Sequence, residues 1–444
     1  MSKKVFLKGT LILACTGLVS RIAGFFYRIF LSHAIGAEGL GLYQLILPLQ
    51  GLMAALSYTG IQSALSRLIA SRLALQEKKE AYFSLVTGIF AAVFFSAVAG
   101  FLLFQHAYFF ASAILKTPQT AGLLRITAVS IPLCAIHSCI NSYYYARKKA
   151  SVPAAVQLSE QTVRIGATYI LYLIFLSEGR PVTAMIAAGG SLAGEAAASL
   201  ISLLMVSFHF GNHPVKEKTS FKIFPLIKDL FTLSFPISLN RILLTLLGSI
   251  EAVLIPQMLI RCGMTSSEAL KIYGIFTGMA LPLLLFPSTI TTSAAVMLMP
   301  SVARMDALGD QKQIRYVTDQ TFFLCMFLGF LCGSGFFLFG PFLGTLLFHS
   351  KTAGTYIRYL SFICPFLYTN TMLASILQGL GRPGRCLIHS AAGILIRIFS
   401  VVFMIPAIGI RGYFYGIFLG ELLLSLLHVK ALKFPYRQAG DNRL

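Results

Sequence analysis

Long apolar stretches recur along the whole sequence and limit its fold more than any other feature. At about 20 residues or more, each is long enough to cross the roughly 30 Å hydrocarbon core of a bilayer as an α-helix. The spans of a β-barrel would instead show about ten residues of alternating polarity, a pattern that is not visible here. Only 11% of the residues are charged, whereas an average soluble domain has about 25%. The sequence therefore predicts an all-α integral membrane protein.

The apolar pattern predicts about twelve transmembrane helices. They are expected at residues 9–34, 40–66, 81–106, 121–145, 153–177, 181–208, 229–257, 270–300, 317–347, 355–379, 386–410 and 411–429. With the N-terminus inside, the cytoplasmic segments hold 23 of the 36 Lys and Arg residues and the outer segments hold 8. This follows the positive-inside rule. We expect a multi-pass protein of the cytoplasmic membrane with both termini in the cytoplasm, and interpret the net charge of +21 as a topology signal rather than a nucleic-acid-binding surface.

Few features of the sequence indicate catalysis or a cofactor. The eight cysteines lie singly in or beside apolar spans, without a Cys-x-x-Cys motif or a close Cys/His cluster, so we expect neither disulfides nor structural zinc. Residues 379–384 satisfy the pattern GxGxxG but lie between two apolar helices, which predicts a turn. Walker loops and nucleophile elbows are absent from the sequence, and the acids are scattered. We predict no catalytic residue, no metal site and no cofactor, and hence not an enzyme.

The second half of the sequence resembles the first, and the matches fall on equivalent spans in the same order. The pairs, with the difference between their residue numbers, are Arg21 and Arg241 (220), Pro48 and Pro282 (234), Pro132 and Pro365 (233), Arg164 and Arg397 (233), and Glu195 and Glu421 (226). Because six is an even number, both halves start on the same side of the membrane and form parallel repeats. We expect two six-helix lobes, residues 1–215 and 216–444, around a central cavity.

Arginines prevail among the charges of the first and seventh spans. Arg21 and Arg28 lie seven residues apart, which brings them within about 20° of one stripe on a helix. Guanidinium groups bind phosphate oxygens in a bidentate manner and stay charged. Arg241 is the counterpart of Arg21, and Glu251 follows it by ten residues. We predict Arg21, Arg28, Arg241 and Arg397 as substrate-binding residues. In the alternative interpretation Arg28 reaches the outer interface and Arg21 pairs with an acid.

The acids within the spans fit either ion pairs or a coupling site. Glu160 precedes Arg164 by four residues, which favours an ion pair within one helix. Glu195 and Glu421 each follow a glycine at a repeated position, where each could pair with an arginine or bind a proton or cation. The candidate coupling or ion-pair residues are Glu160, Arg164, Glu195, Glu251 and Glu421.

The stretch SRIAGFFYRIFLSHAIGAEGLGLYQLILP, from Ser20 to Pro48, resembles the stage V sporulation protein B and MurJ-type flippase group of the multidrug/oligosaccharidyl-lipid/polysaccharide (MOP) exporter superfamily. The match comprises a Ser-Arg-x-x-Gly-Phe stretch and a second Arg, here Arg28, one residue later than in the MurJ type. This resemblance implies a flippase for undecaprenyl-pyrophosphate-linked saccharides that works by alternating access, with Arg21 and Arg28 in its cavity. MurJ-type members usually have fourteen spans and we expect twelve, which leaves lipid II itself open as a substrate.

Two other functions remain as alternatives. A drug/cation antiporter of the same superfamily would need a buried acidic site, whereas Arg outnumbers the acids in the first and seventh spans. This favours a lipid-linked oligosaccharide, a precursor of peptidoglycan or polysaccharide, as the substrate. The second alternative is a membrane scaffold that transports nothing. The expected partners are membrane lipids and the lipid-linked substrate, with cell-wall synthesis proteins as candidates and no nucleic acid.

Overall fold

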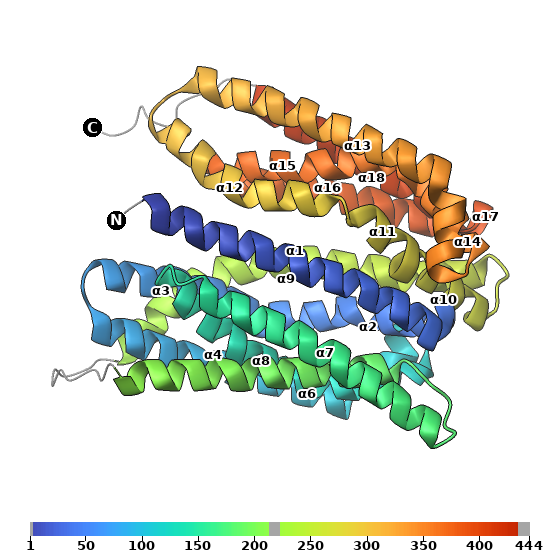
Figure 1. The fold of residues 1–444 in the computed structure, drawn as a ribbon, viewed down its shortest axis with the longest axis horizontal. Helices are drawn as coiled ribbons and strands as arrows, with labels where there is room; N and C mark the ends of the chain where they lie inside the picture. The colour runs from blue at the N-terminus through green and yellow to red at the C-terminus, as the bar shows by residue number, and fades with distance from the viewer. Residues whose placement is uncertain (1–2, 213–222, 434–444) are drawn as a thin grey trace. The chain divides into compact units, whose positions relative to one another are not determined.

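The computed structural model describes residues 3–212 and 223–433, and no strand occurs within these ranges. The elements in chain order (Figure 1) are α1 (Lys3–Ala34), α2 (Gly36–Ser57), α3 (Thr59–Ala74), α4 (Lys78–Gln105), α5 (Ala107–Phe109), η1 (Phe110–Ile114), η2 (Pro118–Thr120), α6 (Ala121–Ala146), α7 (Ser151–Ser177), α8 (Met185–Asn212), α9 (Ile223–Arg261), α10 (Ser266–Gly274), η3 (Ile275–Ala280), α11 (Leu281–Leu285), α12 (Ser288–Ala307), α13 (Gln311–Phe348), α14 (Lys351–Leu360), η4 (Ser361–Ile363), α15 (Cys364–Gly379), α16 (Pro383–Phe403), α17 (Ile405–Ile408) and α18 (Ile410–Lys433).

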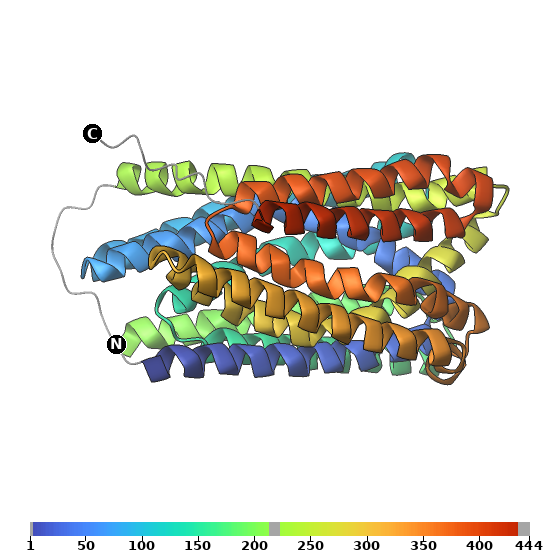
Figure 2. The same cartoon turned by 90° about the horizontal axis from the view of Figure 1, so that it is seen from above.

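The helices form two compact units, Met1–Met279 and Ala280–Leu444. Within each unit the long helices run beside one another (Figures 1 and 2). The first unit includes α9 and α10, because α9 packs against α2 and α3 and α10 packs against α2. The predicted lobe boundary between residues 215 and 216 lies outside the described residues and stays a prediction.

Ten helical segments of the described chain are long and apolar enough to cross a membrane. They cover 36–57, 78–105, 118–146, 185–211, 226–261, 266–285, 311–348, 351–379, 383–403 and 410–432. Helices α1 and α7 have 32 and 27 residues, which correspond to lengths of about 48 and 40 Å. These two helices carry the charged residues that the sequence placed inside the first and fifth spans. The predicted all-α membrane class is confirmed.

Four predicted spans are not single continuous α-helices. The span at 40–66 divides at Tyr58 into α2 and α3. The span at 270–300 divides into α10, η3, α11 and α12, where η3 is a π-helix and Pro287 lies directly before α12. The span at 355–379 divides into α14, η4 and α15, and the span at 386–410 divides at Met404 into α16 and α17. A proline lacks the N–H of a helical hydrogen bond. Pro287 therefore explains the break before α12, whereas no proline accompanies the break at Tyr58. Pro48 and Pro132, by contrast, lie inside α2 and α6.

Small residues allow α7 and α8 to approach each other closely. A Cβ atom on Gly194 would lie 2.9 Å from the backbone oxygen of Glu160 and 3.1 Å from Cβ of Arg164. In the second unit, a Cβ atom on Gly420 of α18 would lie 3.0 Å from Cγ of Arg397 on α16. Close helix crossings of this kind are common in membrane proteins. They bring the charged residues that follow each glycine next to an arginine of the neighbouring helix.

Candidate functional site

A buried polar network lies where α6, α7 and α8 meet in the first unit. Nε2 of His137 is 2.9 Å from Oε2 of Glu195, and Nη2 of Arg164 is 3.7 Å from Oε1 of the same carboxylate. Arg164 also pairs with Glu160, one turn earlier on α7. The four side chains are only 10% to 23% exposed. Two carboxylates therefore share one guanidinium group and one imidazole in a water-poor environment.

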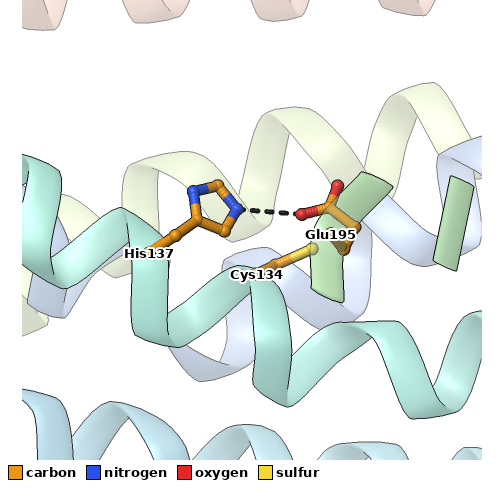
Figure 3. A group of neighbouring side chains, drawn as sticks. All are labelled: Cys134, His137 and Glu195. Atoms are coloured by element: carbon orange, nitrogen blue, oxygen red, sulfur yellow. Dashed lines mark hydrogen bonds and ion pairs between the residues drawn. The ribbon is translucent and has the colours of Figure 1, made fainter. Parts of the chain in front are cut away.

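Cys134 extends this network along α6. Its Sγ atom, a ring nitrogen of His137 and a carboxylate oxygen of Glu195 all lie within 4.8 Å of one another. Figure 3 shows the thiol and the imidazole on one side of α6, both directed at Glu195 of α8. The prediction that the chain has no close Cys/His cluster was therefore wrong. Cys134 and His137 are three residues apart and so share a helix face, and Glu195 comes from a distant part of the chain.

The second unit contains a related network. Nη1 of Arg397 on α16 is 3.3 Å from Oε1 of Glu421 on α18. Asn370 of α15 donates from Nδ2 to Oε2 of the same carboxylate at 2.8 Å, and Ser425 donates to Oδ1 of Asn370 at 2.6 Å. Asn370 lies 233 residues after His137, and Arg397 lies 233 residues after Arg164. We call this interval of 233 residues the repeat offset. The matched positions of the repeat thus build an equivalent Arg–Glu pair in each unit.

Tyr27 joins α1 to this part of the first unit. Its hydroxyl is 2.9 Å from Oγ1 of Thr168 on α7, and Thr168 donates to the backbone oxygen of Arg164 at 2.8 Å. Arg28 is the next residue and is half-buried. It makes no ion pair or hydrogen bond with any residue that the structure describes, although Tyr43 of α2 interacts with it electrostatically. The contact between Tyr27 and Thr168 therefore fixes the rotation of α1 beside an arginine that lacks an acidic partner within the described ranges.

Three predicted residues, Arg21, Arg241 and Glu251, are not members of the two networks. Arg21 is exposed on α1, and Arg241 is exposed on α9. Glu251, also on α9, is buried at 6% exposure. Ser249 of the same helix donates to the backbone oxygen of Pro48 at 2.9 Å and ties α9 to α2. The structure thus brings Glu160, Arg164 and Glu195 together and joins Arg397 to Glu421, while Arg21 and Arg28 share α1.

Sequence reasoning missed several members of the networks. His137 and Asn370 could have been found from the repeat offset, since both lie five residues after a matched proline. Cys134 carried the weaker signal of a Cys-x-x-His spacing on an apolar helix. Tyr27 and Thr168 carried no signal, because their contact depends on how α1 packs on α7.

Comparisons with known proteins show the family of the chain and proteins with a similar fold. A family model described as "Polysaccharide biosynthesis protein" matches residues 6–306. Stage V sporulation protein B of Bacillus subtilis (strain 168) is 31% identical over 436 residues, which cover 96% of this chain and 83% of that protein. A structure of the lipid II flippase MurJ in an inward closed conformation has a TM-score of 0.71 at 15% identity and covers 96% of this chain and 88% of that one.

The fold is also that of drug transporters. An inward-facing multidrug resistance MATE family transporter of the MOP superfamily has a TM-score of 0.68 at 15% identity, covering 96% of this chain and 99% of that one. At such low identity these structures establish the fold alone. The predicted resemblance to the stage V sporulation protein B and MurJ-type group is confirmed, as is the prediction that the chain is not an enzyme.

Proposed function

The chain belongs to the polysaccharide biosynthesis protein family and has the fold of MOP transporters, and on this premise we propose that it flips an undecaprenyl-pyrophosphate-linked saccharide across the cytoplasmic membrane. Transport would proceed by alternating access between two lobes. The uneven distribution of Lys and Arg among the loops supports an orientation with both termini in the cytoplasm. Membrane lipids and the lipid-linked substrate are the proposed partners, with cell-wall synthesis proteins as further candidates.

The observation that carries this proposal is the environment of Arg28. The guanidinium group is half-buried and has no acidic partner among the described residues. An arginine at bilayer depth normally faces a partner or a water-filled cavity, because its charge is costly in hydrocarbon. A pyrophosphate would supply the missing negative charge and accept bidentate hydrogen bonds. We therefore assign Arg28 to direct contact with the substrate.

The other arginines have supporting roles in the proposal. Arg21 shares α1 with Arg28 and lies two helical turns away, at a distance along the axis of about 10 Å. Arg241 occupies the matched position on α9. Arg397 is paired with Glu421 and would contact the substrate only in a state in which this pair opens. Glu251 is proposed as a partner for a cation or an arginine on α9.

The first-unit network is our proposed coupling site. Glu160 and Glu195 place two carboxylates beside Arg164 and His137. With one guanidinium group for two acids, this network can take up one further positive charge without leaving a net charge in the membrane interior. The same buried acids favour the second candidate function, a drug/cation antiporter with the MATE fold, in which the acids would serve cationic drugs.

Flipping in proteoliposomes tests the proposal. The purified protein is reconstituted with a fluorescent polyprenyl-pyrophosphate saccharide, and the fraction protected from a membrane-impermeant quencher is followed in time. We expect flipping by the native chain, a loss of at least about tenfold in Arg28→Ala and partial activity in Arg28→Lys. Arg180→Ala is the matched control, because Arg180 is 67% exposed and pairs with Glu178 in a loop. Normal flipping by Arg28→Ala would contradict the assigned role.

A second assay separates the two candidate functions. Efflux of a cationic dye from the same proteoliposomes should not exceed that of protein-free vesicles. Dye efflux that stops in Glu195→Gln, together with no flipping of the pyrophosphate lipid, would instead establish the antiporter.

A further inference from the structure

The triad of Cys134, His137 and Glu195 offers three different metal-ligating groups on two adjacent helices. Their ligand atoms lie within 4.8 Å of one another. Cys134 is 6% exposed and Glu195 is 8% exposed, so bulk water does not compete freely for the site. We propose that this triad binds a divalent transition metal ion of the zinc class and thereby links α6 to α8. The inference is independent of what the protein transports.

The spacing of the triad is close to what coordination needs. Zinc binds histidine nitrogen and carboxylate oxygen at about 2.0 to 2.2 Å, so two such ligands in a tetrahedral site lie about 3.4 Å apart. Nε2 of His137 and Oε2 of Glu195 are 2.9 Å apart. A shift of about half an ångström would open room for the ion between them. Sγ of Cys134 lies within 4.8 Å of both atoms and would have to approach them to about 3.6 Å.

The donor set selects the class of metal. A thiolate, an imidazole and one carboxylate suit zinc and cobalt, whereas calcium and magnesium prefer six or more oxygen ligands. Three protein ligands leave the fourth position of a tetrahedral site to a water molecule. Nε2 of His137, which faces Glu195, would be the ligand atom of the imidazole.

The charge balance around the triad permits a divalent ion. Glu160 and Glu195 with Arg164 sum to a charge of −1, and a thiolate at Cys134 makes −2, which a divalent ion neutralises. Coordination needs this thiolate and a neutral His137, so each proton they carry beforehand leaves for solvent. Tyr58, Tyr27 and Tyr43 are further titratable groups that interact with this region.

The second unit shows that the metal-ligating residues are an addition to the repeated Arg–Glu pair. The positions that match Cys134 and His137 at the repeat offset are Leu367 and Asn370. There the carboxylate of Glu421 is satisfied by a neutral amide and by Arg397. A helix pair of this kind therefore needs neither thiol nor imidazole for its stability, and their presence in the first unit requires another explanation.

Cobalt provides the test, because thiolate-bound Co²⁺ absorbs in the near ultraviolet and tetrahedral Co²⁺ absorbs in the visible range. The full chain, purified without a histidine tag, is titrated with Co²⁺ and then with Zn²⁺. We expect one equivalent of Co²⁺ to give both signals and Zn²⁺ to abolish them. Both absorption bands should be lost in Cys134→Ser. The visible band should change in His137→Asn, which introduces the residue type found at the matching position, Asn370, in the second unit.

Two variants serve as controls. Cys139→Ser changes another buried thiol of α6, and Cys386→Ser changes a thiol 4.0 Å from Nε2 of His428. Both should keep the signals of the native chain. The proposal is overturned if the native chain gives no thiolate band, or if the band survives in Cys134→Ser or disappears in Cys386→Ser. If Cys134→Ser fails to fold, the melting temperature is measured with and without Zn²⁺ instead. Zn²⁺ must raise the melting temperature of the native chain and must not raise that of His137→Asn.

Discussion

The two units contain the same Arg–Glu pair in different surroundings. In the first unit, Arg164 is shared by Glu160 and Glu195, and the second acid also contacts a histidine. In the second unit, Glu421 is bound by Arg397 and by the amide of Asn370. The position that matches Glu160 at the repeat offset is Gly393. The first network thus has more acids than arginines and the second is balanced.

This difference separates a structural role from a functional one. A balanced, fully hydrogen-bonded pair at a helix crossing holds α15, α16 and α18 together without any titratable histidine. The first network keeps the same crossing and has one acid more than it has arginines, which in our proposal serves the exchange of a cation. We therefore propose that the second network serves mainly stability and the first mainly coupling.

Removal of the Glu421 carboxylate should have the largest effect, and removal of Glu195 a smaller one. Glu421→Ala takes the acid from Arg397 and Asn370, and we expect it to lower the free energy of unfolding by about 3 kcal/mol. Glu195→Ala should cost about 1 to 2 kcal/mol, because Arg164 keeps Glu160. Circular dichroism during titration from a mild detergent into a denaturing one measures both. An equal cost of the two substitutions would contradict the division of roles.

Substitution at the helix crossing should have an intermediate effect. Gly194→Ala introduces a methyl group 2.9 Å from the backbone oxygen of Glu160, and we expect it to destabilise the protein by about 1 to 3 kcal/mol. Gly166→Ala on α7 is the matched control, because a Cβ atom there meets nothing within 4 Å. It should be neutral or stabilising by up to about 1 kcal/mol. The same titration compares them, and a harmless Gly194→Ala would show that α7 and α8 are not in close contact.

An exchange of the histidine for its counterpart should have the smallest effect on stability. His137→Asn keeps a hydrogen-bond donor beside Glu195, so the free energy of unfolding should change by less than about 1 kcal/mol. If the first network is the coupling site, transport driven by an ion gradient should nevertheless fall, because Glu195 loses the imidazole that contacts it. Flipping at a fixed gradient measures this, with Asn141→Ala on the same helix as a control. Unchanged transport would place coupling outside the first network.

The fold followed from the sequence where local composition decides it. Apolar length and Lys/Arg placement are sufficient to locate most helices within a few residues. The divisions at Tyr58 and at residues 275–280 were not predictable, because a π-helix and a helix break without proline depend on packing between helices. The repeat offset identified Arg164 and Arg397 as equivalent, since a duplication keeps its register within a span.

The candidate site was predictable only in its local part. Glu160 and Arg164 are four residues apart, and the expected pair is present. Arg397 and Glu421 are far apart in the sequence and lie on different helices, so periodicity along one helix could not join them. Whether Arg28 has a partner is likewise a property of the packed structure, because any acid that could reach it would come from elsewhere in the chain.

Binding of the lipid pyrophosphate by Arg28 is the central claim, and affinity tests it most directly. The native chain in nanodiscs is compared with Arg28→Ala and Arg180→Ala for binding of a polyprenyl pyrophosphate and of the corresponding polyprenyl alcohol. We predict that the native chain and Arg180→Ala prefer the pyrophosphate, and that Arg28→Ala loses about 10- to 100-fold in affinity for it alone. Equal affinity of the native chain and Arg28→Ala for the pyrophosphate would contradict the account.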